Sequence, residues 1–360
     1  MHKFIFPKLF LLLLIVIPSQ LFSQARGTRG DSYYTTKADK IHKKIVTIDT
    51  HNDSALKLNN SVRRNSGSNQ VTFSMMKEGG LDAAFFAIYT GQGPRDEESV
   101  KDADFYASDQ LLRFRSYVES SDQAAFAYNT HDILYNKGRG QISVILALEN
   151  GYPFGKDISQ VERFYNYGVR AVTLCHNYNN DICDASMDTV VEHNGLSPFG
   201  YKVVEEMNRL GIIIDVSHAS SKTLSDVLRV SKLPVIASHS GVYAIKNHKR
   251  NLTDEEIKAI AAKGGLIQVA TGRYFLSDKP KEEVTVKDIA DHIDYVKSLV
   301  GIRHVGIGTD FDGGGGVVGM ENAAKMKNLT VELLKRGYTN RELKMFWGKN
   351  ILRVLRAHSK

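Results

Sequence analysis

Residues 197–218, SPFGYKVVEEMNRLGIIIDVSH, contain one complete unit of a helix followed by a strand. Ser197 is suited to cap the helix, Pro198 to take its first position and Gly211 to end it. Between them, apolar side chains recur at helical spacing and predict one buried face, made of Phe199, Val203, Val204, Met207 and Leu210. The run 211–216, GIIIDV, is then almost continuously apolar, as in a parallel strand that is buried on both faces.

Runs of the same kind recur along the whole chain. Eight expected strands, each followed by a segment of helical period, are IVTI (45–48), LDAAFFAIY (81–89), SVILAL (143–148), RAVTL (170–174), GIIIDV (211–216), PVIAS (234–238), GLIQVA (265–270) and HVGIG (304–308). Three further helices are expected to start at capping boxes, formed by Thr253 with Glu256, Thr285 with Asp288 and Thr339 with Glu342.

Eight alternating units predict an α/β fold, a (β/α)8 TIM-type barrel whose active site lies at the C-terminal ends of the strands. An open, doubly wound sheet is the alternative. In the dinucleotide-binding version of that sheet a glycine-rich turn follows the first strand, but this chain reads DTHNDS (49–54) there. The barrel is therefore favoured.

The first 24 residues are typical of a secretory signal peptide. His2, Lys3 and Lys8 precede an apolar run over 9–17, and cleavage is expected near 23–25. That run is shorter than the roughly 20 residues that span a bilayer, so no stable membrane anchor is expected after cleavage. We expect an exported protein, periplasmic or extracellular, with a single domain over residues 25–360.

Composition narrows the class of partner. The formal charge is +7, but no Lys/Arg run with interleaved aromatic residues is present, which argues against nucleic-acid binding. The chain has two cysteines, Cys175 and Cys183, so disulfides cannot be what holds the fold; whether these two pair stays open.

The stretch 59–80, rich in Asn and Ser, is expected to be a loop over the barrel mouth.

Histidines and acidic residues stand at the ends of the expected strands. They are His51, Asp53, Glu149, His176, His218, His239, Asp310 and Asp312. Because strand ends meet at one face of a barrel, these side chains are expected to converge there. The remaining histidines are expected to face solvent: His42, His131, His193, His248, His292, His304 and His358.

Imidazole nitrogen and carboxylate oxygen suit zinc and similar divalent ions. His51 and Asp53 are two residues apart in extended chain, so they point the same way and are expected to hold one ion. His218 and His239 are expected to hold a second ion, with Glu149 giving one oxygen to each. Two ions about 3.5–4 Å apart share a water or hydroxide that attacks carbonyl or phosphoryl groups.

Several longer motifs follow one another: DTHND (49–53), GGLDAAFFAIY (79–89), LALENG (146–151), IDVSHAS (214–220), VIASHS (235–240), HKRNLTDEEI (248–257), GIGTDFDG (306–313) and WGKNILRVL (347–355). In this order they resemble the membrane (renal-type) dipeptidase family, which are binuclear zinc metallopeptidases with a barrel fold. The resemblance extends from about residue 45 to residue 355. It implies a metallo-dipeptidase that hydrolyses the amide bond of dipeptides with a hydroxide shared by two zinc ions.

The resemblance also implies the role of each ligand. His51 and Asp53 would hold one zinc, His218 and His239 would hold the other, and Glu149 would bridge them.

Three further residues match the family's substrate-handling positions. By the resemblance, His176 would contact the substrate and steady the tetrahedral oxyanion, and Arg250 would bind the terminal carboxylate of the dipeptide. Asp310 would accept and return the proton at the scissile bond. A broad dipeptide specificity, with D-residues accepted at the C-terminal position, is implied as well, and a homodimer is one expectation for the assembly.

Two segments depart from the family's pattern. Residues 150–152 read Asn-Gly-Tyr where the family often has Gly-Gly-His, and LCHNYNNDICD (174–184) replaces its commoner segment. Neither segment touches a proposed metal ligand, but both are expected to reshape the substrate pocket.

Two other functions compete with a dipeptidase. Another binuclear barrel amidohydrolase, acting on cyclic amides, lactones or phosphotriesters, usually begins with His-x-His and often bridges its metals through a modified lysine. Here the pair is His51 with Asp53, and the third strand ends on Glu149. A catalytically inactive barrel retained as a binding protein is expected to have lost a ligand, and none is missing.

Overall fold

A computed structural model of the protein describes Met1, residues 30–58 and residues 69–359. The expected signal peptide, residues 1–24, lies outside the described residues apart from Met1, and so do residues 59–68 of the expected loop. Helix α3 (Phe73–Gly79) occupies the later part of that stretch, so the prediction of a loop up to residue 80 is wrong there. Thr72 caps this helix by accepting a hydrogen bond from the Met75 amide.

Within the described ranges, eight parallel strands form one sheet in chain order. They are β1 (Ile48–Asn52), β2 (Ala83–Tyr89), β4 (Ile142–Glu149), β5 (Val169–Thr173), β6 (Ile213–Asp215), β7 (Ile236–Ser240), β8 (Leu266–Val269) and β9 (Val305–Ile307). A short strand that was not expected, β3 (Ala124–Phe126), pairs with β4 off this path. The segment after the last strand pairs with the segment after the first and so closes the sheet: the Asp53 amide donates to the Phe311 carbonyl at 2.9 Å. The (β/α)8 barrel is therefore confirmed, and the open sheet is excluded.

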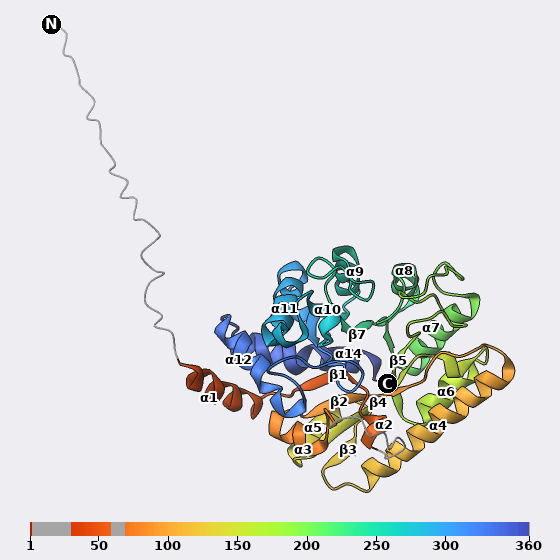
Figure 1. Ribbon diagram of the computed structural model, residues 1–360, viewed down its shortest axis with the longest axis horizontal. Helices are drawn as coiled ribbons and strands as arrows, with labels where there is room; N and C mark the ends of the chain where they lie inside the picture. The colour runs from red at the N-terminus through yellow and green to blue at the C-terminus, as the bar shows by residue number, and fades with distance from the viewer. Residues whose placement is uncertain (2–29, 59–68, 360) are drawn as a thin grey trace.

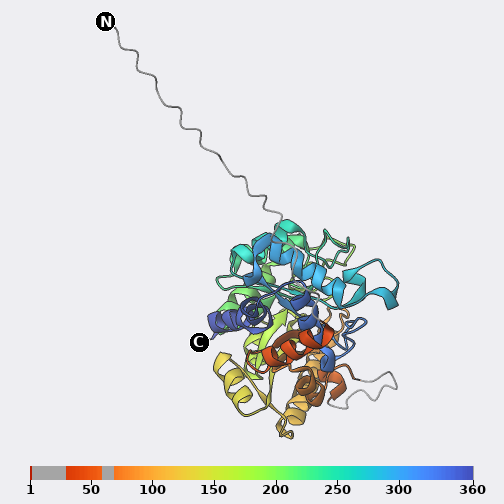
Figure 2. The ribbon, with the colours of Figure 1, turned by 90° about the vertical axis from the view of Figure 1, so that its left-hand side faces the viewer.

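Helices cover the outside of the barrel (Figures 1 and 2), and α1 packs against α12 although the two are far apart in sequence. The α-helices are α1 (Asp31–His42), α2 (Ala55–Leu58), α3 (Phe73–Gly79), α4 (Glu97–Glu119), α5 (Thr130–Gly138), α6 (Ser159–Asn166), α7 (Pro198–Leu210), α8 (Ser221–Val230), α9 (Asp254–Ala262), α10 (Arg273–Leu276), α11 (Val286–Val300), α12 (Lys327–Lys335), α13 (Asn340–Lys344) and α14 (Asn350–His358). A π-helical turn, η6 (Met345–Lys349), joins α13 to α14, and short 3-10 segments are η2 (Tyr152–Phe154), η3 (Lys281–Glu283), η4 (Ile302–His304) and η5 (Ala323–Lys325). No helix in the described ranges is both long enough and apolar enough to cross a membrane.

The sequence signals at helix ends are confirmed. Helix α7 starts after Ser197, whose side chain accepts a hydrogen bond from the Gly200 amide, and it ends at Gly211 with φ of 81°. The three expected capping boxes all form, at the starts of α9, α11 and α13. Each box satisfies two backbone donors that a helix start would otherwise leave unpaired.

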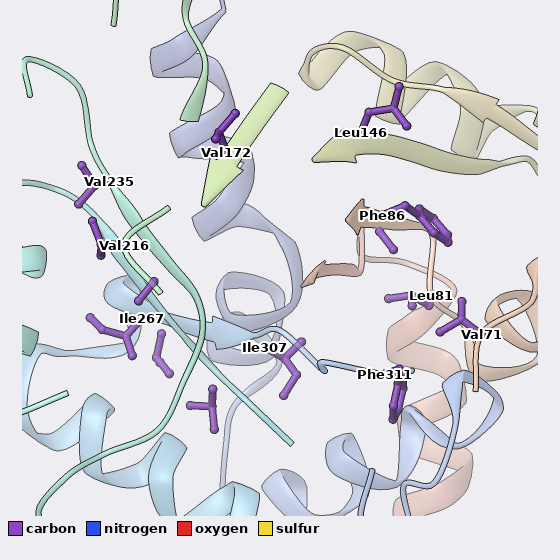
Figure 3. Packing of buried hydrophobic residues seen from close by; sticks show 14 of the residues in the cluster. Val71, Leu81, Phe86, Leu146, Val172, Val216, Val235, Ile267, Ile307 and Phe311 are labelled. Carbon is purple, nitrogen blue, oxygen red and sulfur yellow. The ribbon is translucent and has the colours of Figure 1, made fainter. Parts of the chain in front are cut away.

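The core has two apolar layers. The outer layer lies between strands and helices, and Figure 3 shows Phe86, Leu146, Val172 and Ile267 among its residues. The inner layer fills the barrel and is closed from below by α14; it includes Ile48, Phe85, Ile145, Ala147, Ala171, Ile213, Ile236, Leu266, Ile351 and Val354. Side chains alternate along a strand, so Ile145, Ala147 and Glu149 of β4 share the inward face. The barrel interior thus changes from apolar to acidic where β4 ends.

Several histidines expected in solvent are buried instead. His42, His292 and His358 are 4%, 0% and 5% exposed. His248 lines the cavity described below. The assignments of His42, His292 and His358 are corrected, because tertiary packing rather than local sequence decides where a lone histidine lies. Cys175 and Cys183, whose pairing was open, are buried free thiols.

His42 is held by two hydrogen bonds that need the neutral ring. Its Nδ1 lies 3.0 Å from the Gly80 carbonyl oxygen, which accepts the ring proton. Its Nε2 lies 2.6 Å from Thr330 Oγ1 and accepts the hydroxyl proton, while the Trp347 indole donates to the same hydroxyl at 2.8 Å. This network joins α1, α12 and η6.

His42 makes the stability of the fold depend on pH. Burial lowers its pKa from 6.5 to about 4. Unfolding therefore takes up a proton below pH 6.5, so this contribution to the free energy of unfolding is present above that pH and is lost as pH falls toward 4. Near neutral pH we expect His42→Gln to have a lower free energy of unfolding than the unaltered protein. Between pH 6.5 and 4 the free energy of unfolding of the variant should fall by about 3 kcal/mol less than that of the unaltered protein.

Urea unfolding across this pH range measures the difference. The exposed histidine His131 supplies the matched control, since His131→Gln should keep the pH dependence of the unaltered protein. Equal pH dependence in His42→Gln and the unaltered protein would contradict the assignment.

Candidate metal centre

The carboxylate of Glu149, at the end of β4, lies among four imidazole rings. Its Oε1 is 3.3 Å from His218 Nε2, 3.6 Å from His51 Nε2, 3.7 Å from His239 Nε2 and 3.9 Å from His176 Nε2. Glu149, His51, His218 and His239 are each buried, and His176 is partly exposed. Residues that lie on β1, β4 and β7 and in the segments after β5 and β6 therefore meet at the C-terminal face of the barrel.

Asp53 joins this cluster beside His51. Its Oδ2 lies 3.6 Å from His51 Nε2. In the described part of the chain, His51 Nε2 and Asp53 Oδ1 are buried and have no hydrogen-bond partner. Buried polar atoms are normally paired, because leaving one unpaired costs about 1–3 kcal/mol. Both atoms are thus suited to bind a cation.

Hydrogen bonds on the far side of two rings fix their tautomers. Ser238 Oγ donates to the Asp215 carboxylate at 2.6 Å, so it accepts from His239 Nδ1 at 2.8 Å. His218 Nδ1 donates to Asn177 Oδ1 at 3.0 Å. Both rings therefore direct an unprotonated Nε2 into the cluster, and these two atoms lie 3.0 Å apart. Unprotonated Nε2 with a hydrogen-bonded Nδ1 is the form in which histidine binds metal.

Two buried carboxylates tie the strand ends together beneath the cluster. Asp215 of β6 accepts from Thr173 Oγ1 of β5 at 2.6 Å and from the Ser238 amide of β7 at 2.8 Å. Asp49 of β1 accepts from Thr309 Oγ1 at 2.6 Å and from the Thr309 amide at 2.8 Å. These bonds hold the backbone that carries the histidines.

Residues that follow β4, β6 and β9 have a positive φ, a backbone conformation that favours glycine. Asn150, His218, Asp310 and Asp312 have φ of 78°, 69°, 59° and 67°. Such backbone strain persists where the surrounding structure enforces it, and it clusters at functional sites. The carboxylate of Asp312 is bonded to Lys57 Nζ at 2.6 Å, so its role is structural.

A cavity of about 450 Å³ opens over the cluster. The residues assigned to substrate chemistry from the sequence line it together with aromatic side chains: His176, Arg250, Asp310, Tyr89, Tyr274 and Phe275. Arg250 is 5% exposed and donates to the His239 carbonyl at 3.2 Å. It forms no ion pair with any described residue, and its Nε is unpaired. A buried guanidinium without a carboxylate is suited to bind an anionic ligand.

Burial and neighbouring charges set the protonation of the cluster. Burial, followed by nearby positive charge, lowers the pKa of His218 and of His239 well below the usual value, so both are neutral at pH 7. Burial opposes protonation of His51, but the charges of Glu149 and Asp53 raise its pKa well above the usual value. Metal ions bind neutral imidazole, so an ion at His51 would compete with the proton on its ring.

The donor set fits divalent metal ions. Three overlapping groups place their ligand atoms within 4.8 Å of one another: His51 with Asp53 and Glu149, Glu149 with His176 and His218, and His51 with Asp215 and His239. Imidazole and carboxylate together suit zinc. Asp215 already accepts hydrogen bonds from Thr173 and Ser238, so its position is that of a supporting residue.

The sequence interpretation missed the residues that orient the ligands. Asn177, Asp215 and Ser238 each act through hydrogen bonds across neighbouring strands, which no local pattern reveals. Their positions did carry a signal, because Asp215 and Ser238 lie next to or near the predicted histidines on the same strands. Tyr89, whose ring packs edge-on against His176, was also missed.

Known proteins resemble this chain over most of its length. A sequence profile of membrane dipeptidase (peptidase family M19) matches residues 35–360. The dipeptidase tcpJ of Claviceps purpurea is 34% identical over 295 residues, covering 79% of this chain and 68% of that protein. The structure of the probable dipeptidase PvdM from Pseudomonas aeruginosa has a TM-score of 0.84 at 27% identity, covering 91% of this chain and 98% of that one. An amidohydrolase structure from the same organism has a TM-score of 0.76 at 30% identity, covering 89% and 98%.

Replacing Ser238 by Ala tests whether the hydrogen bond to His239 Nδ1 orients a metal ligand. Because the ring loses its acceptor, we expect metal affinity to fall by about 10- to 100-fold. Competition with a chromophoric chelator measures it. The control is Ser221→Ala, an exposed serine at the start of α8, and unchanged affinity in Ser238→Ala would contradict the orienting role.

Proposed function

This chain belongs to the membrane dipeptidase family, peptidase family M19, and we propose that its Glu149 cluster holds two zinc ions that serve the hydrolysis of dipeptides by a bridging hydroxide. The chain is a metallo-dipeptidase. The observation that carries the zinc proposal is the set of unpaired nitrogen and oxygen atoms directed at one buried carboxylate.

Each metal would have its own ligands and one in common. His51 and Asp53 would hold one ion, His218 and His239 the other, and Glu149 would bind both. When bound, two such ions lower the pKa of water toward neutrality and polarise the scissile carbonyl. The protein's own contribution is to keep His218 and His239 neutral and oriented, so that no reorganisation is needed when the ions bind.

Arg250 would position the substrate. Its guanidinium lies in the wall of the cavity over the cluster and has no carboxylate partner among the described residues. A C-terminal carboxylate would supply that partner through charge-assisted hydrogen bonds. Because Arg250 and the metal cluster line the same cavity, the anchored carboxylate would leave the preceding amide bond beside the cluster, which favours short substrates.

His176 and Asp310 would serve the reacting atoms. Burial and then the charge of Arg250 lower the pKa of His176 to about 4. A neutral ring of this kind would donate a hydrogen bond to the oxygen that gains charge during attack. Burial and then the charge of Asp53 raise the pKa of Asp310 well above its usual range. Asp310 would therefore accept the proton from the attacking water and return it to the leaving amine.

The cavity supports a broad specificity. Its volume of about 450 Å³ lies in the range of small-molecule sites, and away from the cluster Tyr89, Tyr274, Phe275 and Met187 contribute to its walls. We infer that side chains of different size are accepted, including a D-residue at the C-terminal position, because the anchoring contacts are made to the carboxylate and the amide rather than to the side chain.

The enzyme is proposed to work outside the cytoplasm. The expected signal peptide supports export to the periplasm or the medium without a stable membrane anchor, which N-terminal sequencing of the exported protein tests.

The proposed partner is a small dipeptide, not a nucleic acid. A homodimer is proposed as the assembly, and light scattering measures it.

Metal content and activity should rise and fall together. Protein purified without chelator should hold about two divalent ions per chain and hydrolyse several dipeptides. Stripping the metal should abolish activity, and zinc should restore it. Glu149→Gln should lose both, since the ligand common to the two ions is weakened, whereas the exposed Glu98→Gln should not. Less than one equivalent of metal after reconstitution, or no dipeptide cleavage, would sink the proposal.

Arg250→Ala should raise KM for dipeptides by about thirtyfold or more, because losing one partner of a buried charge pair costs about 2–5 kcal/mol. The variant should also lose any preference for a free C-terminal carboxylate over a C-terminal amide. Arg273, which lies beside the cavity residue Tyr274 but outside the lining, is the control. If Arg250→Ala still discriminates against amidated dipeptides as the unaltered enzyme does, the carboxylate is held elsewhere.

A further inference from the structure

A second cavity, of about 570 Å³, lies at the opposite end of the barrel. Helix α5, the end of α13, the turn η6, helix α14 and the residues just before β1 form its walls. Val46 of this wall precedes the first residue of β1, so the cavity opens where the strands begin. It shares no lining residue with the cavity over Glu149. We call it the basic pocket.

Six of the ten residues that line the basic pocket are cations: Lys44, Lys137, Lys344, Lys349, Arg353 and Arg356. No described Asp or Glu lines it. Residues 2–29 and 59–68 contain no acidic residue, so those segments cannot supply a carboxylate either. The pocket therefore carries a strong excess of positive charge.

This charge is largely uncompensated. Of the six cations only Lys137 has an ionic partner in the described ranges, Asp82 at 2.6 Å. Arg353 donates to the backbone oxygens of Gly264 and Arg303, which leaves its charge in place. Burial and then the charge of Arg303 lower the pKa of Arg353, as expected where positive groups gather. Clustered like charges raise the free energy of the folded state, and a bound anion would lower it.

The walls of the basic pocket combine these charges with apolar surface. Val46, Leu134 and Leu352 line it, and Leu134 is 51% exposed. The turn η6, which carries Lys349, packs directly on the chain before β1: a Cβ on Gly348 would lie 2.2 Å from the Val46 carbonyl oxygen. Single π-helical turns inside helices occur frequently at functional sites. The pocket is thus a concavity with an apolar wall, and the exposed side chains of Lys44, Lys344, Lys349 and Arg356 line it.

We propose that the basic pocket binds a phosphorylated organic anion with at least two negative charges, through Lys44, Lys344, Lys349 and Arg356. Ammonium and guanidinium groups form charge-assisted hydrogen bonds with phosphate oxygens. The volume is in the range of small-molecule sites, and the apolar wall suits a ligand with a carbon skeleton. A soluble phosphorylated molecule and the headgroup of an anionic lipid offer the same chemistry.

Two probes distinguish these sources, both used with the metal-loaded full chain. Calorimetric titration with fructose 1,6-bisphosphate tests a soluble ligand. Sedimentation with vesicles of phosphatidylcholine plus phosphatidylglycerol, against phosphatidylcholine alone, tests a lipid headgroup. The test variant replaces Lys344, Lys349 and Arg356 by Ala, and the control replaces Lys77, Lys202 and Lys258, which are exposed elsewhere and remove the same charge.

Binding of either probe that falls about a hundredfold in the test variant, and at most a few-fold in the control, supports the proposal and identifies the source. Hydrolysis of dipeptides should be unchanged in both variants, because neither touches the cavity over Glu149. If the test variant fails to fold, Lys44→Gln with Lys344→Gln should weaken binding roughly twentyfold. No binding of either probe, or equal loss in test and control variants, would overturn the proposal.

Discussion

The buried carboxylate of Glu149 is the group around which the C-terminal face of the barrel is organised. Removing a carboxylate from water costs several kcal/mol unless positive charge or hydrogen bonds compensate. The nearest groups are imidazole nitrogens. Those of His218 and His239 are unprotonated, and the positive charge that His51 carries when protonated is shared between Glu149 and Asp53, so the compensation is partial. Divalent ions between the carboxylate and these nitrogens would stabilise both, which is why the metal proposal accounts for an otherwise costly arrangement.

The barrel supports this cluster in layers. An apolar layer, closed by α14, fills the interior below, and its packing makes the strand ends rigid. Above it, Asp49 and Asp215 join neighbouring strand ends through hydrogen bonds. The ligands stand above both layers on backbone that is itself strained at His218. This order gives a preformed site whose geometry does not depend on the substrate, as catalysis by positioned groups requires.

The sequence predicted the strands, the capped helices and the convergence of the histidines, because these follow from local periodicity and from the rule that barrel strand ends share one face. It did not predict β3 or the burial of His42, because each depends on a contact with a residue far away in the chain. The orienting role of Ser238 depends on its hydrogen bond to Asp215, 23 positions away, whereas α3 was missed although its capping residue Thr72 is local. Thr330, which binds His42, is 288 positions distant. Basic residues at 44, 137 and 344–356 likewise form one pocket only after the barrel has closed.

Anomalous diffraction at the zinc edge, from crystals grown with zinc, locates any metal ions bound at Glu149. We expect two peaks about 3.5–4 Å apart, one on each side of the Glu149 carboxylate. One peak should lie against His51 and Asp53, and the other against His218 and His239. No peak at Glu149, or a single peak that leaves one of these pairs without metal, would contradict this expectation.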